Sequence, residues 1–279
     1  MIDHIRGRID YDECGSGPTI VLVPGSCSTG AAWRPVISSF NDQFRCVTTS
    51  LLGYGATEER CTAFDSSISH EAEALECVIR KAGGPVHLVG HSFGGLVALV
   101  VALRNRVPLA SLVIAEAPAM EILRATESHH YDVFRKMTEA YFADFASGNV
   151  GTIETMIDFY GGPGTFASWP AKVRSYAEQT TPVNILDWAS AYGFPLEVAS
   201  LAAVHVPTLI LWGGASHPAM QCANTLLSES INGAALATVS GAAHFMITTH
   251  ANEVARLMAQ HVHHAERHHV LSRQRDICL

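Results

Sequence analysis

The stretch PVHLVGHSFGGLVALVVALRN, residues 85–105, constrains the fold of this chain more than any other part of it. An apolar run enters the motif GHSFG at 90–94, and a longer apolar run follows it. A G-x-S-x-G motif between a buried strand and a helix is typical of a tight turn that exposes a serine hydroxyl, and its glycines make room where a Cβ would clash. We therefore predict a strand, a sharp turn that carries Ser92 as a candidate nucleophile, and a helix.

Short apolar runs bounded by Gly or Pro recur along the chain, as expected for buried strands. Segments with helical periodicity lie between several of them or follow them. This alternation predicts βαβ units and a mostly parallel sheet, which binds ligands at the carboxyl ends of its strands. The predicted strands lie at 19–25, 44–50, 85–90, 110–118, 206–214 and 234–241, and the predicted helices at 68–83, 93–105, 218–231 and 251–267.

One long segment interrupts this alternation, because no parallel strand is indicated between about residue 118 and residue 204. Residues 131–194 hold 13 of the 22 aromatic residues of the chain, more than a plain connection requires. We predict that 119–204 is a helical cap inserted into a core domain made of 1–118 and 205–279. An ordinary helical subdomain that packs its own small core is the alternative.

Composition excludes several classes of partner. With 18 basic and 26 acidic residues the formal net charge is −8, and no basic block is present that could neutralise a phosphate backbone, so we expect no nucleic-acid partner. The apolar runs are shorter than the roughly 20 residues that span a bilayer, and the first residues lack a signal-peptide core, so we expect a cytoplasmic protein without a membrane partner. The seven cysteines form no CxxC pair, which favours reduced thiols over disulfides or a zinc site.

The chain resembles the α/β-hydrolase superfamily along nearly its whole length. The resemblance rests on GHSFG, on GSGPTIVLVPGSCSTGAAW (15–33), on LLGYGAT (51–57) and on SGAAHF (240–245). It implies an α/β fold with a mostly parallel eight-stranded sheet, flanking helices and a cap. It also implies an oxyanion hole made by the backbone N–H groups of Ser26 and Phe93. Pro24 departs from the usual histidine of the family, but such a hole uses backbone donors.

A serine hydroxyl needs a neighbouring base, and the chain offers 15 histidines. His244 lies in the small-residue loop SGAAHF after the last predicted strand, which resembles the family's catalytic histidine loop, so we predict that it is the base. The alternative is a loop histidine that caps the next helix. His91 adjoins the serine, and we assign it to packing or to the pocket wall.

The acid is missing from its usual place after the strand VPTLILW. No Asp or Glu occurs from 198 to 228, and His217 in WGGASHP cannot act as a two-oxygen acceptor. Glu116 in SLVIAEAPAM ends the strand that follows the nucleophile helix, and this run resembles the acid-bearing run of haloalkane dehalogenases. Those enzymes use Asp where this chain has Ser92, so we do not expect dehalogenation. We predict Glu116 as the third member of a triad, the alternative being a residue that orders the first turn of the cap.

These predictions describe a serine hydrolase with an acyl-enzyme intermediate that acts on a small, largely apolar ester, lactone, thioester or carbon–carbon bond. We expect no cofactor and no metal, although His264 and His268 lie one helical turn apart. Further candidate substrate-binding residues are Cys27, His91, Trp169 and His217. The alternative for Cys27 is that it is a small buried residue that only fills the core. A catalytically weak binding or receptor protein and a lyase remain alternatives, and a homodimer is left open.

Overall fold

The computed structural model describes the backbone of residues 1–4, 7–59, 61–124, 126 and 128–277. Side chains are described for the same residues except 4 and 268–277. The side chain of His268 and the whole of Cys278, both used in the predictions above, therefore lie outside the described residues.

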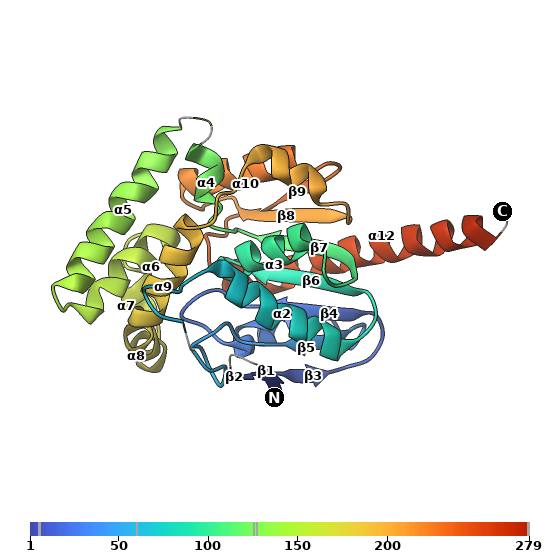
Figure 1. The fold of residues 1–279 in the computed structure, drawn as a ribbon, viewed down its shortest axis with the longest axis horizontal. Helices are drawn as coiled ribbons and strands as arrows, with labels where there is room; N and C mark the ends of the chain where they lie inside the picture. Colours follow the sequence, from blue (N-terminus) through green and yellow to red (C-terminus); the bar gives the residue numbers. More distant parts are fainter. Residues whose placement is uncertain (5–6, 60, 125, 127, 278–279) are drawn as a thin grey trace.

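The described residues contain one seven-stranded sheet with the order β3-β5-β4-β6-β7-β8-β9 (Figure 1). β3 at one edge pairs antiparallel with β5, and the other neighbours pair in parallel. The sheet places β4 between β5 and β6, so the strand order reverses there, and such a reversal opens a crevice at the carboxyl ends. The strands are β3 (Asp12–Cys14), β4 (Thr19–Val23), β5 (Arg45–Thr48), β6 (Val86–His91), β7 (Leu109–Ala115), β8 (Thr208–Gly213) and β9 (Ala235–Val239).

The predicted fold class is confirmed, but the predicted number of eight strands is wrong for the described part of the chain. β1 (Ile2–His4) and β2 (Gly7–Ile9) form a separate antiparallel pair. Asp10 separates this pair from β3 because its backbone groups bond to side chains: its N–H donates to Thr57 Oγ1, and its carbonyl accepts from Thr49 Oγ1. A continuous ladder through Asp10 would need these same groups.

The parallel strands are buried on both faces. In β4, Ile20 and Leu22 belong to one hydrophobic core and Val21 and Val23 to the other. This follows from the two-residue period of a strand, which sends successive side chains to opposite faces. It also explains why the strand sequences are continuous apolar runs without alternation.

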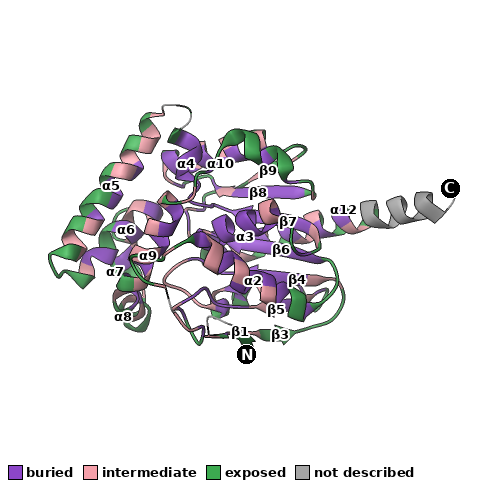
Figure 2. Cartoon of the chain, viewed as in Figure 1, coloured by how far each residue is buried: buried purple, intermediate pink, exposed green. Residues whose placement is uncertain are grey.

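Helices cover each face of the sheet. The core that contains Val21 and Val23 lies under α2 (Ile68–Ala82), α3 (Phe93–Arg104) and α10 (Pro218–Ser230). The core that contains Ile20 and Leu22 lies under α1 (Arg34–Ser39), α11 (Met246–Thr249) and α12 (Ala251–Ile277). A 3-10 turn, η1 (Gly30–Trp33), leads into α1. Figure 2 shows the central strands of the sheet and the helix α3 as the most completely buried part of the molecule.

Between β7 and β8 the described chain is helical. Figure 1 shows these helices gathered at one end of the sheet, toward the carboxyl ends of the strands. They are α4 (Met120–Arg124), α5 (His129–Ala146), η2 (Val150–Thr152), α6 (Ile153–Gly161), α7 (Thr165–Ser168), α8 (Ala171–Gln179), α9 (Thr181–Tyr192) and η3 (Val198–Ala203). We call the segment 119–204 the cap segment; its standing as a separate domain stays a prediction.

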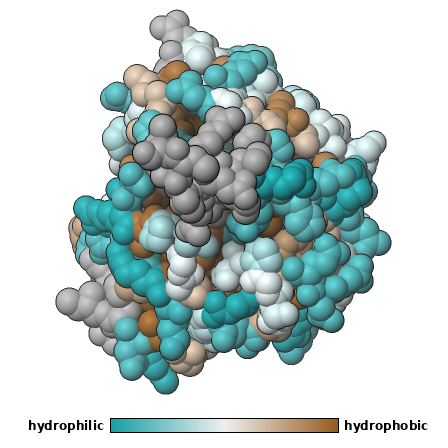
Figure 3. Space-filling view, turned by 90° about the vertical axis from the view of Figure 1, so that its right-hand side faces the viewer, coloured by the Kyte–Doolittle hydropathy of each residue, from teal (hydrophilic) through white to brown (hydrophobic). Residues whose placement is uncertain are grey.

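The end of the molecule opposite the cap segment is mainly hydrophilic, and apolar residues come to its surface in small scattered spots (Figure 3). Within the described residues, no helix has the length and apolar character needed to cross a membrane.

Candidate active site

Ser92 lies on a strained turn between β6 and α3. Its φ and ψ of 54° and −129° lie outside the conformations that L residues favour. Three glycines allow the turn: a Cβ on Gly90 would lie 2.2 Å from the Gly94 carbonyl oxygen, one on Gly94 would lie 2.2 Å from the Pro24 carbonyl oxygen, and one on Gly25 would lie 2.7 Å from Ser92 Cβ. The glycines of GHSFG are therefore required by close backbone approach.

A chain of hydrogen bonds joins Ser92, His244 and Glu116. Ser92 Oγ lies 2.9 Å from His244 Nε2, and His244 Nδ1 lies 2.8 Å from Glu116 Oε2. These residues follow β6, β9 and β7, whose carboxyl ends meet at one edge of the sheet. The carboxylate requires a proton on Nδ1, so Nε2 of the neutral ring is left to accept the Ser92 hydroxyl proton.

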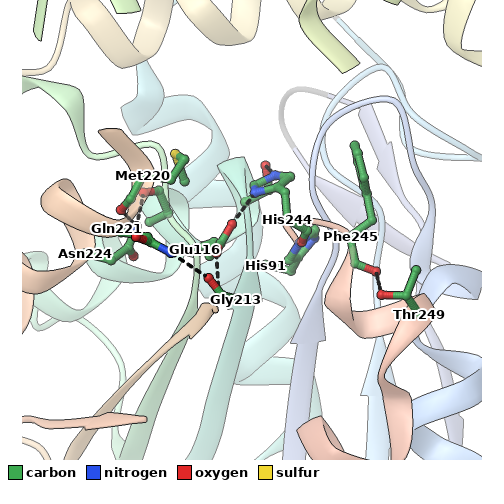
Figure 4. Close-up of polar contacts among 11 residues, drawn as sticks. His91, Glu116, Gly213, Met220, Gln221, Asn224, His244, Phe245 and Thr249 are labelled. Carbon is green, nitrogen blue, oxygen red and sulfur yellow. Dashed lines mark hydrogen bonds and ion pairs between the residues drawn. The ribbon is translucent and has the colours of Figure 1, made fainter. Parts of the chain in front are cut away.

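Glu116 occupies an enclosed site beside β8. Figure 4 shows its carboxyl group between His244 and Gly213, whose N–H donates to Glu116 Oε1 at 2.6 Å. The side chain is fully buried, and its φ of 49° is uncommon for a residue other than glycine. Burial opposes ionisation, but the bonds from His244 and Gly213 and the nearby Ser216 hydroxyl outweigh it and hold the pKa of Glu116 below its usual value.

The loop WGGASHP after β8 contributes its backbone to this site in place of an acid. Gly213 supplies the N–H that binds Glu116, and its carbonyl accepts from the Gln221 side chain at 3.2 Å. A Cβ at Gly213 would lie 2.3 Å from the Ala242 carbonyl oxygen, so the loop closes tightly on the His244 loop. The empty acid position and Glu116 are thus parts of one hydrogen-bonded arrangement.

His91 lies behind His244 and outside the pocket lining. Its Nε2 lies 2.8 Å from the His244 carbonyl oxygen, so Nε2 carries a proton and donates it to this bond. Burial lowers the pKa of His91 to about 3, which keeps the ring neutral. His91 therefore supports the backbone of His244, and the prediction that it binds substrate is not supported by its position.

Ser26 and Phe93 lie where the predicted oxyanion hole requires them. Ser26 follows β4, the strand next to β6, and Phe93 opens α3 directly after Ser92. The first N–H groups of a helix have no acceptor within that helix, and they favour negative charge. Both residues line the pocket together with Ser92 and His244. Their role as oxyanion donors stays a prediction.

A pocket opens onto Ser92 and His244. Cys27 and Trp169 both line it. Burial raises the pKa of the Cys27 thiol to about 12, so this side chain is a neutral part of the wall. The lining is mostly apolar or aromatic and comprises Ser26, Cys27, Ser92, Phe93, Pro118, Met156, Ile157, Tyr160, Trp169, Asn184, Asp187, Trp188, Ala191, His244 and Phe245.

His217 is absent from the residues that line this pocket. It caps α10, where its Nδ1 accepts from the Ala219 N–H at 3.1 Å, and its ring stacks on Phe159 at 4.3 Å. A histidine that precedes a proline at the start of a helix can cap that helix through its side chain. The prediction that His217 binds substrate did not take this capping role into account.

Asn184 and Asp187 are polar pocket residues that sequence reasoning missed. Both lie on α9 within the cap segment, and both are buried. Asp187 Oδ2 accepts from Ser26 Oγ at 2.5 Å and from the Tyr54 hydroxyl at 2.6 Å. The spacing of 184, 187, 188 and 191 places these residues on one helical face, and this periodicity was the signal available in the sequence.

Aromatic rings connect His244 to the cap segment. The Tyr160 ring stacks on the His244 imidazole with centroids 4.3 Å apart and planes inclined by 26°. Trp188 stacks on Tyr160, and Tyr192 stacks on Trp188. The Arg135 guanidinium lies 4.7 Å from the Tyr192 ring centroid and completes this aromatic column. One face of the imidazole is therefore covered by a residue of the cap segment.

No group of three or more His, Cys, Asp or Glu residues that could hold a metal ion is found among the described residues. His264 is among these described residues, and the side chain of His268 is not.

Comparison with known proteins identifies relatives over part or most of the chain. The model of the alpha/beta hydrolase family matches residues 20–257. Haloalkane dehalogenase 2 from Mycobacterium tuberculosis (strain ATCC 25618 / H37Rv) is 33% identical over 104 residues, which cover 37% of this chain and 36% of that protein. The pimeloyl-[acyl-carrier protein] methyl ester esterase of Vibrio cholerae is 33% identical over 136 residues, or 48% of this chain and 51% of that protein. The matches thus span between about a third and a half of these relatives' length.

Solved structures show the same fold over nearly the whole chain. An esterase from Exiguobacterium antarcticum has a TM-score of 0.73 at 19% identity, covering 94% of this chain and 98% of that one. A thermophilic esterase from Thermogutta terrifontis has a TM-score of 0.72 at 20% identity, covering 94% and 96%. At these identities the likeness concerns the fold alone.

Proposed function

The chain belongs to the alpha/beta hydrolase family, and from this premise we propose that it is a serine hydrolase of small carboxylic esters, lactones or thioesters. In this proposal Ser92 is the nucleophile, His244 the general base and Glu116 the acid that orients His244. The observation that carries the proposal is the continuous hydrogen-bond chain from Ser92 Oγ through the imidazole to the Glu116 carboxylate. Nucleophile, base and orienting acid in mutual contact are the geometry that acyl transfer requires.

The reaction proceeds in two halves. Ser92 Oγ attacks the carbonyl carbon and passes its proton to His244 Nε2, and the amides of Ser26 and Phe93 stabilise the oxyanion. His244 then gives the proton to the leaving oxygen or sulfur atom, which leaves an acyl-enzyme. Water, deprotonated by His244, attacks the acyl group, and collapse of the second oxyanion releases the acid and returns the proton to Ser92.

The ionisation of Glu116 supports this assignment. The imidazolium formed in each half-reaction needs a negative charge beside Nδ1, and a carboxyl group buried alone would be protonated at neutral pH. The bonds from His244 and the Gly213 amide hold the pKa of Glu116 below its usual value, so the group is charged when the imidazolium forms.

The substrate class is proposed from the pocket. Its lining is dominated by side chains such as Met156, Ile157, Trp188 and Phe245, which favour a compact, largely apolar acyl or alkyl group. The relatives named above include an esterase and a dehalogenase. The serine nucleophile favours ester hydrolysis. Haloalkane dehalogenases use an Asp carboxylate as nucleophile, and this chain has Ser92 in that position.

Hydrolysis of p-nitrophenyl butyrate tests the proposal. Wild-type protein should release p-nitrophenol, and Ser92→Ala should lower kcat about 10⁶-fold, because substitution of a triad nucleophile removes covalent catalysis. The matched control is Ser200→Ala, which removes an exposed hydroxyl in η3 outside the pocket lining and should leave kcat unchanged. Equal activity of wild type and Ser92→Ala would refute the assignment of the nucleophile.

Labelling with a fluorophosphonate provides a second, substrate-independent readout. Labelling of Ser92 in wild type and its loss in Ser92→Ala support an activated serine. A folded wild-type protein that is neither labelled nor active would instead be a binding protein with this fold.

A further inference from the structure

We infer that Asn184 and Asp187 form a binding site for a hydroxyl or oxo group located a few atoms from the scissile carbonyl of the substrate. The inference rests on the proposed hydrolase function and narrows its substrate class. It assigns the enzyme to hydroxy- or oxo-substituted esters in preference to esters of plain alkyl acids and alcohols.

Asn184 presents hydrogen-bond donors that have no acceptor within the described part of the chain. Asn184 is 1% exposed and lines the pocket. Its Oδ1 accepts from the Tyr141 hydroxyl at 2.9 Å, which fixes the orientation of the amide, and no acceptor for its Nδ2 is found among the described residues. A buried amide nitrogen normally has a partner, so this one is free for a ligand oxygen.

Asp187 lies one helical turn along the same face of α9. Both bonds to protein hydroxyls use Oδ2, and Oδ1 has no partner among the described residues. Burial raises the pKa of Asp187 to about 7, so near neutral pH its carboxyl group can donate to an oxo group or accept from a hydroxyl. The two side chains together offer both donor and acceptor functions.

The charge around this site favours a neutral ligand group. No Lys or Arg is among the described residues that line the pocket. The negative charge of Asp187 disfavours ionisation of Glu71, and that of Glu59 disfavours ionisation of Asp187. An anionic substituent would add negative charge to this buried acidic environment, and a neutral hydroxyl or oxo group would not.

Ser26 fixes how far the site lies from the reacting carbonyl. Its N–H is one of the two proposed oxyanion donors, and its hydroxyl bonds directly to Asp187. The carboxyl group of Asp187 is therefore separated from the oxyanion position by the length of one serine residue. A substituent that reaches it must be close to the scissile carbonyl, on either the acyl or the alcohol side.

Matched ester pairs test this site, with the acid released measured by titration at constant pH. On the acyl side, ethyl 3-hydroxybutanoate is compared with ethyl 3-methylbutanoate, in which a methyl group replaces the hydroxyl. On the alcohol side, 2-hydroxyethyl butanoate is compared with propyl butanoate. Wild type should prefer the hydroxylated ester in at least one pair by about tenfold in kcat/KM, since the apolar ester leaves buried polar groups unpaired.

Variants separate recognition from a structural role of the two residues. Asn184→Leu should lower kcat/KM for the preferred hydroxylated ester about tenfold more than for its apolar partner. The control Met156→Leu changes an apolar wall of the same pocket and should change both esters of a pair by a similar factor. Asp187→Asn keeps a carbonyl oxygen for Ser26 and Tyr54, and it should retain part of the preference.

Absence of a preference in both pairs in the wild type would overturn the inference without any variant. Equal losses for both esters in Asn184→Leu would overturn it as well, because they would indicate a structural role. In either case Ser92-dependent hydrolysis would leave the proposed function intact. No hydrolysis of any ester, together with no fluorophosphonate labelling, would refute the proposed function and this inference with it.

Discussion

Replacing Asp187 by Asn should stabilise the protein increasingly as the pH rises. Burial raises the pKa of Asp187 from its usual 3.8 to about 7. The folded protein therefore keeps a proton up to about pH 7 that the unfolded chain releases above about pH 4. Between these values the unfolded state binds fewer protons, so the free energy of unfolding falls as the pH rises.

The pKa difference sets the size of the effect. About three pH units at about 1.4 kcal/mol per unit give about 4 kcal/mol of lost stability above pH 7. About 2.5 kcal/mol of this loss falls between pH 5 and pH 8. Asn cannot ionise, and its oxygen still accepts from Ser26 and Tyr54. Glu71 adds to the effect in the same direction. The negative charge of Asp187 raises the pKa of Glu71, so the Asp187→Asn variant lowers that pKa and loses less stability as the pH rises.

Urea-induced unfolding at pH 5, 6, 7 and 8 measures this difference. The unfolding free energy of Asp187→Asn minus that of wild type should rise by about 2.5 kcal/mol from pH 5 to pH 8. The exposed Asp132→Asn variant in α5 controls for the loss of one acidic residue. A difference that stays constant across this range, or falls, would refute the conclusion that Asp187 is protonated in the folded protein near neutral pH.

Three further predictions concern the site and its turn. Glu116→Gln should keep the fold by circular dichroism but lower kcat about 10³- to 10⁴-fold, because an amide cannot balance the imidazolium charge; full activity would require another acid. Tyr160→Leu should lower kcat/KM about tenfold and Tyr160→Phe should retain kcat/KM, because the face of the aromatic ring stabilises the imidazolium of His244. Equal losses of kcat/KM in the two variants would refute this role of the ring. Gly94→Ala should destabilise the fold by about 3 kcal/mol in urea unfolding, because its Cβ would lie 2.2 Å from the Pro24 carbonyl oxygen; unchanged stability would show that the turn can relax.

The central strands could be predicted because each is an apolar run that must be buried on both sides. The segments 85–90 and 110–118 correspond to β6 and β7, and helix 93–105 corresponds to α3. The strands at the start of the chain could not be predicted in this way. β3 is an exposed edge strand with the sequence DEC, and its place depends on antiparallel pairing with β5, which the local sequence does not encode.

Residues of the site differ in how far the sequence reveals them. Ser92, Glu116 and His244 each follow a recognisable strand, so the parallel sheet itself brings their positions together. Asp187 and Asn184 come from a helix of the cap segment, and their contact with the pocket depends on how that segment docks. His217 shows the opposite error: its position after β8 suggested the pocket, but the local start of α10 determines where its side chain lies.

The aromatic column has a consequence for how such an enzyme can diversify. Tyr160 and Trp188 line the pocket and also stand between the histidine and the rest of the cap segment. A substitution that reshapes the pocket for a new substrate at these positions changes the surroundings of the proton-transfer group at the same time. Substitutions of Tyr160 or Trp188 therefore change substrate selectivity and kcat together. Substitutions of pocket residues outside the column, such as Met156, can change substrate selectivity without changing the surroundings of His244.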